Sequence, residues 1–203
     1  MLIHDVEQGS PEWYALRLGI PTASAFDKIL TPTGKLSTQA EAFINKLLAE
    51  EMTGEAMQVE KTVWMERGNE LEQEAADYYE LINDVELVKV GFCTNDAKTF
   101  GCSPDRLVGE EGALEIKVPA PHTHIEYLRK GEIDKGYWSQ LQGNLLVLNR
   151  KWIDWMSYNP KMPSLILKAD RDEKYLSDLQ TALDEFAIKY QAAKQIMTDK
   201  GYL

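Results

Sequence analysis

Two acids and a lysine near the middle of the chain have the types and spacing needed for phosphate chemistry. Asp105 follows Pro104, and Glu115 and Lys117 flank Ile116 in a later apolar run. The stretch 105–118 predicts a β-hairpin that turns at the polar, glycine-flanked segment 109–112. Because side chains alternate along a strand, Glu115 and Lys117 share one face, and the turn brings Asp105 nearly opposite Glu115.

Two carboxylates held this close repel each other unless a cation lies between them. A hard divalent ion such as Mg²⁺, which takes oxygen ligands, suits such a pair. Lys117 can then orient or deprotonate a water, or stabilise charge that develops on a phosphate. The same spacing also fits a surface hairpin with an exposed Glu–Lys pair, because short motifs recur by chance.

The surrounding chain favours the chemical interpretation. Pro104-Asp105 and Glu115-Ile116-Lys117 resemble the signature of the PD-(D/E)xK nuclease superfamily and, more narrowly, of the phage lambda exonuclease (YqaJ-like) family. Blocks similar to those of the family occur in order at 17–24, 67–72, 102–105 and 140–142, and together they span most of the chain.

This resemblance implies a Mg²⁺-dependent 5′-to-3′ exonuclease that digests one strand of linear double-stranded DNA and leaves 3′ overhangs for phage-type recombination. Two Mg²⁺ ions, with Mn²⁺ as a substitute, would be held by Asp105, Glu115, the Ile116 carbonyl and Glu72. Lys117 and Gln140 would complete the catalytic group. The implied partners are a DNA end with a 5′-phosphate, two further copies in a ring-shaped homotrimer, and a single-strand annealing recombination protein.

An arginine and two hydroxyl side chains near the N-terminus indicate an anion site. Arg17 ends the first predicted helix, and Thr22 and Ser24 stand at the start of the next. A guanidinium, hydroxyls and free N–H groups can converge on a phosphate, although Arg17 alone would also fit a helix C-terminal cation. The resemblance implies that this is the pocket for the 5′-phosphate of the DNA end.

Glu72 and Gln140 are weaker candidates on pattern alone. Glu72 follows Gly68, which would let its helix approach another backbone closely, but it also fits a solvated acid among acidic neighbours. Gln140 and Gln142 point about 200° apart on a helix, so only one of them can face the site. The resemblance favours Gln140. Leu36, in the loop after Gly34, is a candidate wedge at a duplex end.

Composition limits the alternatives. The 203 residues predict a single domain over 1–203, with no apolar run long enough to span a membrane and no secretion signal. Two cysteines make no disulfide framework, which fits a reducing cytosol. The resemblance implies a phage or prophage protein in the cytoplasm of a bacterial host. The net charge of −11 excludes a broadly basic surface, so any DNA contacts must be local.

Periodicity and cap residues predict an α/β fold. The resemblance makes this a restriction-endonuclease-like core with a mixed central β-sheet flanked by helices. Thr38 and Glu41 predict a capping box, and His122 and His124 predict solvated or capping roles. Helices are expected at 11–18, 22–30, 38–53, 61–82 with an interruption at Gly68, 122–129, 137–148 and 176–193, and strands at 88–92, 98–101, 105–108, 113–118, 152–158 and 165–167.

Two other classes of function remain open at this point. One is a different branch of the superfamily, either an endonuclease or a RecB-like iron–sulfur nuclease, although the latter needs four cysteines and only two are present. The other is a non-catalytic DNA-end-binding or scaffold module on the same fold. The presence of Asp105, Glu115 and Lys117 argues against an inactive site.

Overall fold

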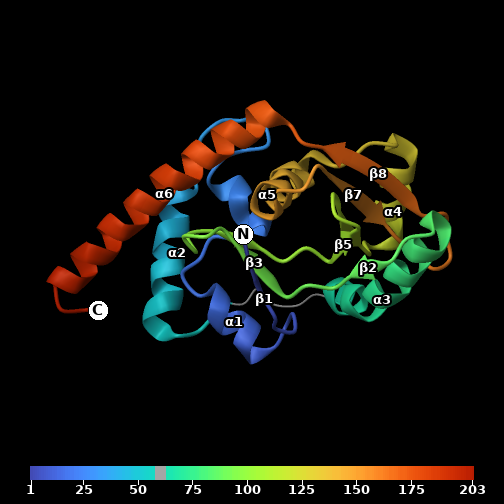
Figure 1. The fold of residues 1–203 in the computed structure, drawn as a ribbon. Coiled ribbons are helices and arrows are strands. Elements are labelled where there is room, and N and C mark those ends of the chain that lie inside the picture. Colours follow the sequence, from blue (N-terminus) through green and yellow to red (C-terminus); the bar gives the residue numbers. More distant parts are fainter. Residues whose placement is uncertain (58–62) are drawn as a thin grey trace.

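A five-stranded mixed sheet forms the centre of the computed structural model, which describes residues 1–57 and 63–203 (Figure 1). Only the β6–β7 pair is parallel, as expected for a mixed sheet, and the other neighbours are antiparallel. The order across the sheet is β2 (Leu87–Val88), β5 (Arg106–Val108), β6 (Gly112–Lys117), β7 (Trp152–Ser157) and β8 (Leu165–Asp170). The predicted fold class is therefore confirmed.

A second, three-stranded antiparallel sheet was not predicted. It consists of β1 (Leu2–His4), β3 (Phe92–Thr94) and β4 (Gly101–Cys102). The single strand expected over 88–92 is wrong, because the chain leaves one sheet after β2 and enters the other at β3. Gly91 lies at this crossing, where a Cβ would lie 2.0 Å from the Val6 carbonyl oxygen. Only glycine allows the backbone to pass so close.

Helices cover both faces of the central sheet, close to the predicted positions (Figure 1). They are α1 (Pro11–Arg17), η1 (Ala23–Lys28), α2 (Ala40–Thr53), α3 (Val63–Asn83), α4 (Pro121–Lys130), η2 (Lys135–Tyr137), α5 (Trp138–Leu148) and α6 (Glu173–Asp199), where η marks a 3₁₀ helix. Among the described residues, no helix is long and apolar enough to cross a membrane.

The alternation along β6 divides the apolar interior into two clusters. Leu114 and Ile116 pack with Ala75 and Tyr79 of α3 on one face of the sheet. Ala113 faces the other cluster, which contains residues of η1, α2, α5 and α6. Because neighbouring residues of a strand point to opposite faces, this packing directs Glu115 and Lys117 toward the α5 side of the sheet.

The helix starts differ in how they are capped. Ser10 caps α1, since its Oγ accepts a hydrogen bond from Trp13 N at 3.2 Å. The predicted Thr38–Glu41 capping box is wrong, because α2 begins after Gln39. The Gln39 N–H donates to Ser37 Oγ at 3.3 Å instead. The hydroxyl group that bonds the backbone here is therefore that of Ser37, in the turn before the helix.

Two further expectations about single residues are corrected. α3 runs through Gly68 without a break, and a Cβ at Gly68 would meet nothing within 4 Å, so this glycine allows no close backbone approach. His124 is fully buried rather than solvated, because its ring nitrogens contact Ser157 Oγ at 2.7 Å and the Pro163 carbonyl at 2.9 Å. His122 is exposed, as expected.

The close approach that matters for the site lies on α5 instead. A Cβ at Gly143 would lie 2.5 Å from the ring of Phe26 and 3.1 Å from the Cβ of Ala23, both on η1. Glycine at this position therefore lets η1 press against α5. As a result, Ser24 on η1 and Gln140 on α5 lie on neighbouring elements.

Gly143→Ala is expected to lower the free energy of unfolding by about 1–3 kcal/mol, because an added methyl group overpacks this contact. The matched control is Gly68→Ala, where a Cβ meets open space. That control should be neutral or stabilise the helix by about 0.5–1 kcal/mol. Chemical denaturation measures both, and equal stabilities of the two variants would contradict the packing argument.

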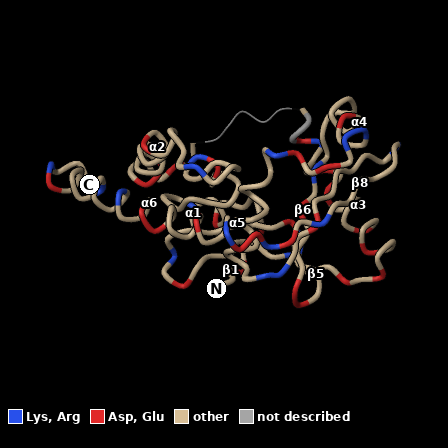
Figure 2. Tube along the Cα trace, turned by 90° about the horizontal axis from the view of Figure 1, so that it is seen from above, with Lys and Arg blue, Asp and Glu red and all other residues tan. Residues whose placement is uncertain are grey.

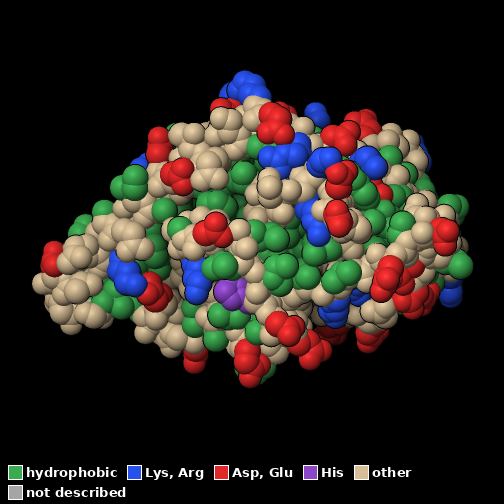
Figure 3. All heavy atoms as spheres, viewed as in Figure 1, with side chains coloured by type: hydrophobic (Ala, Val, Ile, Leu, Met, Phe, Trp, Pro, Cys, Tyr) green, Lys and Arg blue, Asp and Glu red, His purple; other side chains and the backbone are tan. Residues whose placement is uncertain are grey.

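Charged residues follow the expectation of a surface without a broad basic face. Asp and Glu are spread along the whole trace rather than gathered in one element (Figure 2). On the face seen in Figure 3, acidic side chains gather along the lower edge, and Lys and Arg occur as separate small groups. Any strongly cationic site must therefore be a local one.

Candidate active site

The hairpin places the two predicted acids together. In its register Arg106 pairs with Leu114 and Val108 with Gly112, so Asp105, the next residue outward, lies across from Glu115. Asp105 Oδ2 accepts a hydrogen bond of 2.6 Å from the Ile116 N–H. The strand that carries one acid thus orients the other.

Glu115 is 2% exposed, and both of its carboxylate oxygens are held. Oε1 accepts hydrogen bonds from Lys117 Nζ and from Gln140 Nε2, each at 2.6 Å. Oε2 accepts from Asn144 Nδ2 at 3.0 Å. Gln140 and Asn144 lie four residues apart on α5, so one face of this helix clamps the carboxylate.

Only one of the two glutamines faces the site, as the helical period predicts. Gln142 points away and bonds the segment around β8, donating to the Asp170 carbonyl and accepting from the Asp172 N–H, each at 2.9 Å. Gln140 reaches Glu115. Asn144 was missed in the sequence, although its i, i+4 relation to Gln140 is a signal that could have found it.

The electrostatics of this cluster call for additional positive charge. Burial raises the pKa of Asp105 well above its usual range, the charge of Glu115 adds to this, and Lys117 opposes it. Burial alone would lower the pKa of Lys117, but the charges of Glu115 and Asp105 outweigh it and raise that pKa. The ammonium group of Lys117 thus interacts with the carboxyl groups of both Glu115 and Asp105.

Glu72 lies beside the hairpin, but its carboxylate is engaged by an arginine that the sequence did not single out. Arg106 is 3% exposed, and its Nη1 donates to Glu72 Oε1 at 2.7 Å and to the Asp105 carbonyl at 2.6 Å. Glu72 still lines, together with Asp105 and Lys117, a cavity of about 340 Å³. α3 therefore brings a third acid to the site, and Arg106 holds it at the edge.

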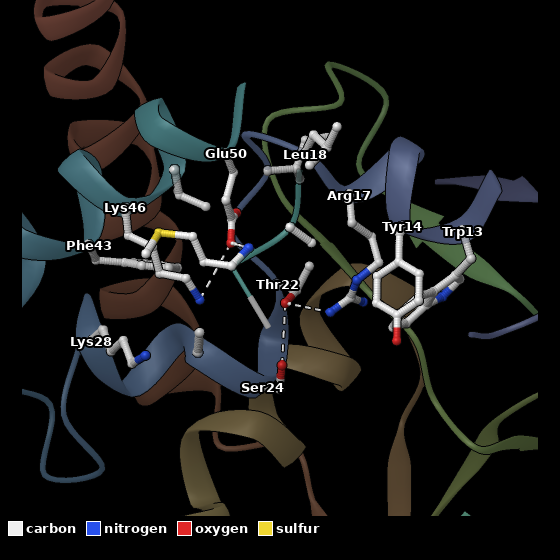
Figure 4. Close-up of a pocket in the computed structure, with 15 residues that line it drawn as sticks. Trp13, Tyr14, Arg17, Leu18, Thr22, Ser24, Lys28, Phe43, Lys46 and Glu50 are labelled. Atoms are coloured by element: carbon white, nitrogen blue, oxygen red, sulfur yellow. Dashed lines mark hydrogen bonds and ion pairs between the residues drawn. The ribbon is translucent and has the colours of Figure 1, made fainter. Parts of the chain in front are cut away.

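Arg17, Thr22 and Ser24 come together as predicted (Figure 4). Arg17 Nη2 donates to Thr22 Oγ1 at 3.3 Å, and Thr22 Oγ1 lies 3.3 Å from Ser24 Oγ. Thr22 precedes η1 but makes no side-chain cap, because its hydroxyl contacts Arg17 instead. Arg17 Nη1 also donates to Ser103 Oγ at 3.2 Å, and its guanidinium stacks 3.9 Å from the ring centre of Trp13.

Arg17 is a half-buried cation whose hydrogen-bond partners are neutral. Burial lowers its pKa to about 10, so it remains charged near neutral pH. In the part of the chain that the structure describes, no carboxylate forms an ion pair with it. A half-buried guanidinium that donates only to hydroxyl groups and stacks on an aromatic ring is suited to bind an anion.

One cavity connects the anion pocket with the acids. Its volume is about 180 Å³. Its lining includes Arg17, Thr22, Ser24 and Ser103 on one side and Asp105, Glu115, Gln140 and Asn144 on the other. The tertiary structure therefore brings both predicted groups to a single site.

The donor chemistry of the acids fits a hard divalent cation. Asp105, Glu115 and Glu72 offer carboxylate oxygens, and Ile116 offers a backbone carbonyl beside them. Burial first and the charge of Glu115 second raise the pKa of Asp105, and a bound cation would oppose both effects. Among the described residues, no three acids, histidines or cysteines are already arranged around one point, in keeping with the contact between Glu72 and Arg106.

Asn144→Leu is expected to reduce activity by about 10- to 100-fold, because residues that orient metal ligands or catalytic carboxylates have effects of this size. The substitution keeps the branching of the side chain at Cγ and removes the donor to Glu115 Oε2. The matched control is Gln142→Leu. This variant also loses the hydrogen bonds of a buried side-chain amide on α5, but Gln142 faces away from the site. Denaturation and turnover measured on both variants separate the two effects: the control should lose stability without a comparable loss of turnover.

The fold and the group of two acids, a lysine and a glutamine define the class as a PD-(D/E)xK nuclease fold of the lambda exonuclease type. The chain belongs to the YqaJ-like viral recombinase domain family, whose model matches residues 12–151.

Solved structures agree with this family. The crystal structure of an alkaline exonuclease, LHK-Exo, from Laribacter hongkongensis is 28% identical, with a TM-score of 0.85 over 95% of this chain and 98% of that one. The same enzyme in complex with dAMP gives 29% identity and a TM-score of 0.84, with the same coverage. A phage-related exonuclease from Haemophilus somnus 129PT shares the fold at 17% identity, with a TM-score of 0.68 over 87% of this chain and 96% of that one. Curated protein sequences give no match.

Proposed function

We propose that this protein is a Mg²⁺-dependent exonuclease that digests one strand of linear double-stranded DNA from its 5′ end and leaves a 3′ overhang. The observation that carries the proposal is the cavity shared by Arg17 and the acids around Glu115. It offers a place for an end phosphate beside a place for bond cleavage. Family membership and the exonuclease relatives support the same reaction.

Asp105, Glu115, the Ile116 carbonyl and Glu72 would hold two Mg²⁺ ions, with Mn²⁺ as a substitute. Bound ions of this kind lower the pKa of water and neutralise charge on the scissile phosphate. Glu72 would have to exchange its contact with Arg106 for this role. Arg106 would then keep α3 attached through Gln73, whose Oε1 it contacts at 2.9 Å.

Lys117 and Gln140 would act on the reacting groups. The ammonium of Lys117 is 2.6 Å from Glu115 Oε1, so it lies next to the carboxylate that faces the cavity. From this position it would orient the attacking water and stabilise negative charge on the phosphate. Gln140 and Asn144 would keep Glu115 in one orientation during the reaction.

Arg17, Thr22, Ser24 and Ser103 would bind the 5′-phosphate. A guanidinium has five N–H donors, and the contacts to Ser103 and Thr22 use two of them. The remaining donors and the hydroxyl groups could take phosphate oxygens. Holding the end here, in the same cavity as Glu115, would limit cleavage to the first phosphodiester bonds.

Assembly, partners and location are also part of the proposal, which family membership supports. We expect a ring-shaped homotrimer around DNA, a single-strand annealing protein as partner, and action in the cytoplasm of a bacterial host. Exposed apolar residues that gather at the end of α3 and around β2, namely Tyr78, Leu81, Ile82, Val85 and Val88, support a contact with another chain. Sedimentation of the purified protein would test the trimer.

The test is digestion of a linear duplex labelled separately at each strand end, with and without Mg²⁺, on 5′-phosphate and 5′-hydroxyl ends. The expected result is Mg²⁺-dependent loss of the 5′-labelled strand, faster with phosphate. Cleavage of closed circular DNA would favour an endonuclease. Binding of DNA ends without cleavage under any divalent ion would favour the scaffold module.

A further inference from the structure

Apart from the cavity that connects it with the acids, the anion pocket borders a second cavity, which is drawn in Figure 4. Its volume is about 310 Å³. Arg17, Thr22 and Ser24 line both this cavity and the one that contains the acids. A phosphate bound by these three residues would therefore have the catalytic group on one side and this second cavity on the other.

The second cavity carries an excess of positive charge. Arg17 reaches into it from α1, and Lys28 of η1 and Lys46 of α2 approach from the opposite side, with Thr22 and Ser24 between (Figure 4). Among the described residues, Glu50 is the one carboxylate in its lining. Three cations and one acid in a single cavity are unusual for a chain of net charge −11.

The contacts of these cations leave capacity for an anion. Lys46 Nζ lies 3.5 Å from Glu50 Oε1, and that oxygen also accepts from the Met57 N–H at 3.1 Å. Lys28 Nζ lies 5.5 Å from the ring centre of Phe43. Among the described residues, no carboxylate is ion-paired with Lys28. Glu50 is thus shared between Lys46 and a backbone N–H, and the Lys28 ammonium lies over an aromatic ring.

We propose that this cavity binds a second phosphate group, carried by the DNA end beyond the phosphate held by Arg17. This inference rests on the proposed function, because it takes the Arg17 pocket as the site of an end phosphate. Lys28 and Lys46 are the residues that would bind the additional charge. Two kinds of DNA end carry such a group: a 5′-triphosphate, and an unpaired 5′ nucleotide that bears its own phosphate.

The test measures binding without catalysis. Full-length protein in EDTA is titrated into fluorescent duplexes with a 5′-hydroxyl, a 5′-monophosphate, a 5′-triphosphate, or one unpaired 5′-phosphorylated nucleotide, and Kd is read from anisotropy. The variants are Lys28→Gln and Lys46→Gln. The matched control is Lys161→Gln, an exposed lysine in the loop between β7 and β8 that lines neither cavity.

The parent protein should bind at least one of the ends with a second phosphate about five- to tenfold more tightly than the monophosphate end, as one or two charge-assisted contacts allow. Comparing the Kd of the 5′-triphosphate end with that of the end with an unpaired nucleotide identifies which of them supplies the second phosphate. In Lys28→Gln and Lys46→Gln the ratio of the two Kd values should fall toward one, whereas Lys161→Gln should keep it. Unfolding curves confirm that each variant is folded.

Equal affinity of the parent for all phosphorylated ends would overturn the inference while leaving the exonuclease proposal intact. A preference that survives in both lysine variants would overturn it as well. Equal affinity for hydroxyl and monophosphate ends would instead overturn the Arg17 pocket, and the second phosphate site with it.

Discussion

We expect Lys117→Met to lower the rate of strand digestion by about 10³-fold. An effect of this size is typical of a group that transfers a proton or stabilises developing charge. Methionine keeps the length of the side chain and removes its charge. Lys117 is the cation bound to Glu115, at 2.6 Å, and it also opposes the raised pKa of Asp105. Initial rates on an end-labelled duplex, under saturating Mg²⁺, measure the loss.

The fold should survive this substitution, because Glu115 retains its hydrogen bonds from Gln140 and Asn144. Unfolding curves test this directly. Lys161→Met, at an exposed position outside the site, serves as the matched control and should digest DNA at the parent rate. A Lys117→Met protein that is folded and digests DNA as fast as the parent would refute the assigned role of this lysine.

Arg17→Gln is expected to remove the preference for a 5′-phosphate, with a loss of about 10- to 100-fold in rate on phosphorylated ends, because charge-assisted hydrogen bonds to phosphate are among the strongest available. Rates on hydroxyl ends should change much less. The ratio of the two rates is therefore the diagnostic quantity. It is measured on one duplex sequence prepared with either end.

Arg17→Lys distinguishes charge from geometry, since lysine retains the charge but cannot reproduce the planar fork that contacts Ser103 and Thr22. We expect it to restore only part of the preference. Arg129→Gln, an exposed arginine on α4, is the charge-matched control. If Arg17→Gln kept the full preference for phosphate, the end-phosphate pocket would have to lie elsewhere.

The sequence by itself determined the parts of the site that depend on local periodicity. Alternation along 113–118 predicts that Glu115 and Lys117 share a face, and the turn predicts that Asp105 lies across from Glu115. Helical spacing predicts that only one of Gln140 and Gln142 faces the site. These relations need only the geometry of one hairpin or one helix, so the residue pattern is sufficient.

Expectations that needed a neighbouring element were less secure. The division of the strands into two sheets depends on the passage of Gly91 beside Val6, which lies far from it in the chain. The burial of His124 likewise depends on what packs around it, namely Ser157 and Pro163. Local propensity does not specify such partners.

Only the tertiary structure decided which side chains complete the site. Asn144 reaches Glu115 because α5 packs against the central sheet, where it contacts β7 beside β6. Arg106 contacts Glu72 because α3 packs on β6. The cavity that contains both Arg17 and the acids is lined by segments that lie far apart in the sequence. The same is true of the cavity lined by Arg17 and Lys46. Such contacts arise when apolar faces pack, and packing depends on the shape of the whole core rather than on any one stretch of residues.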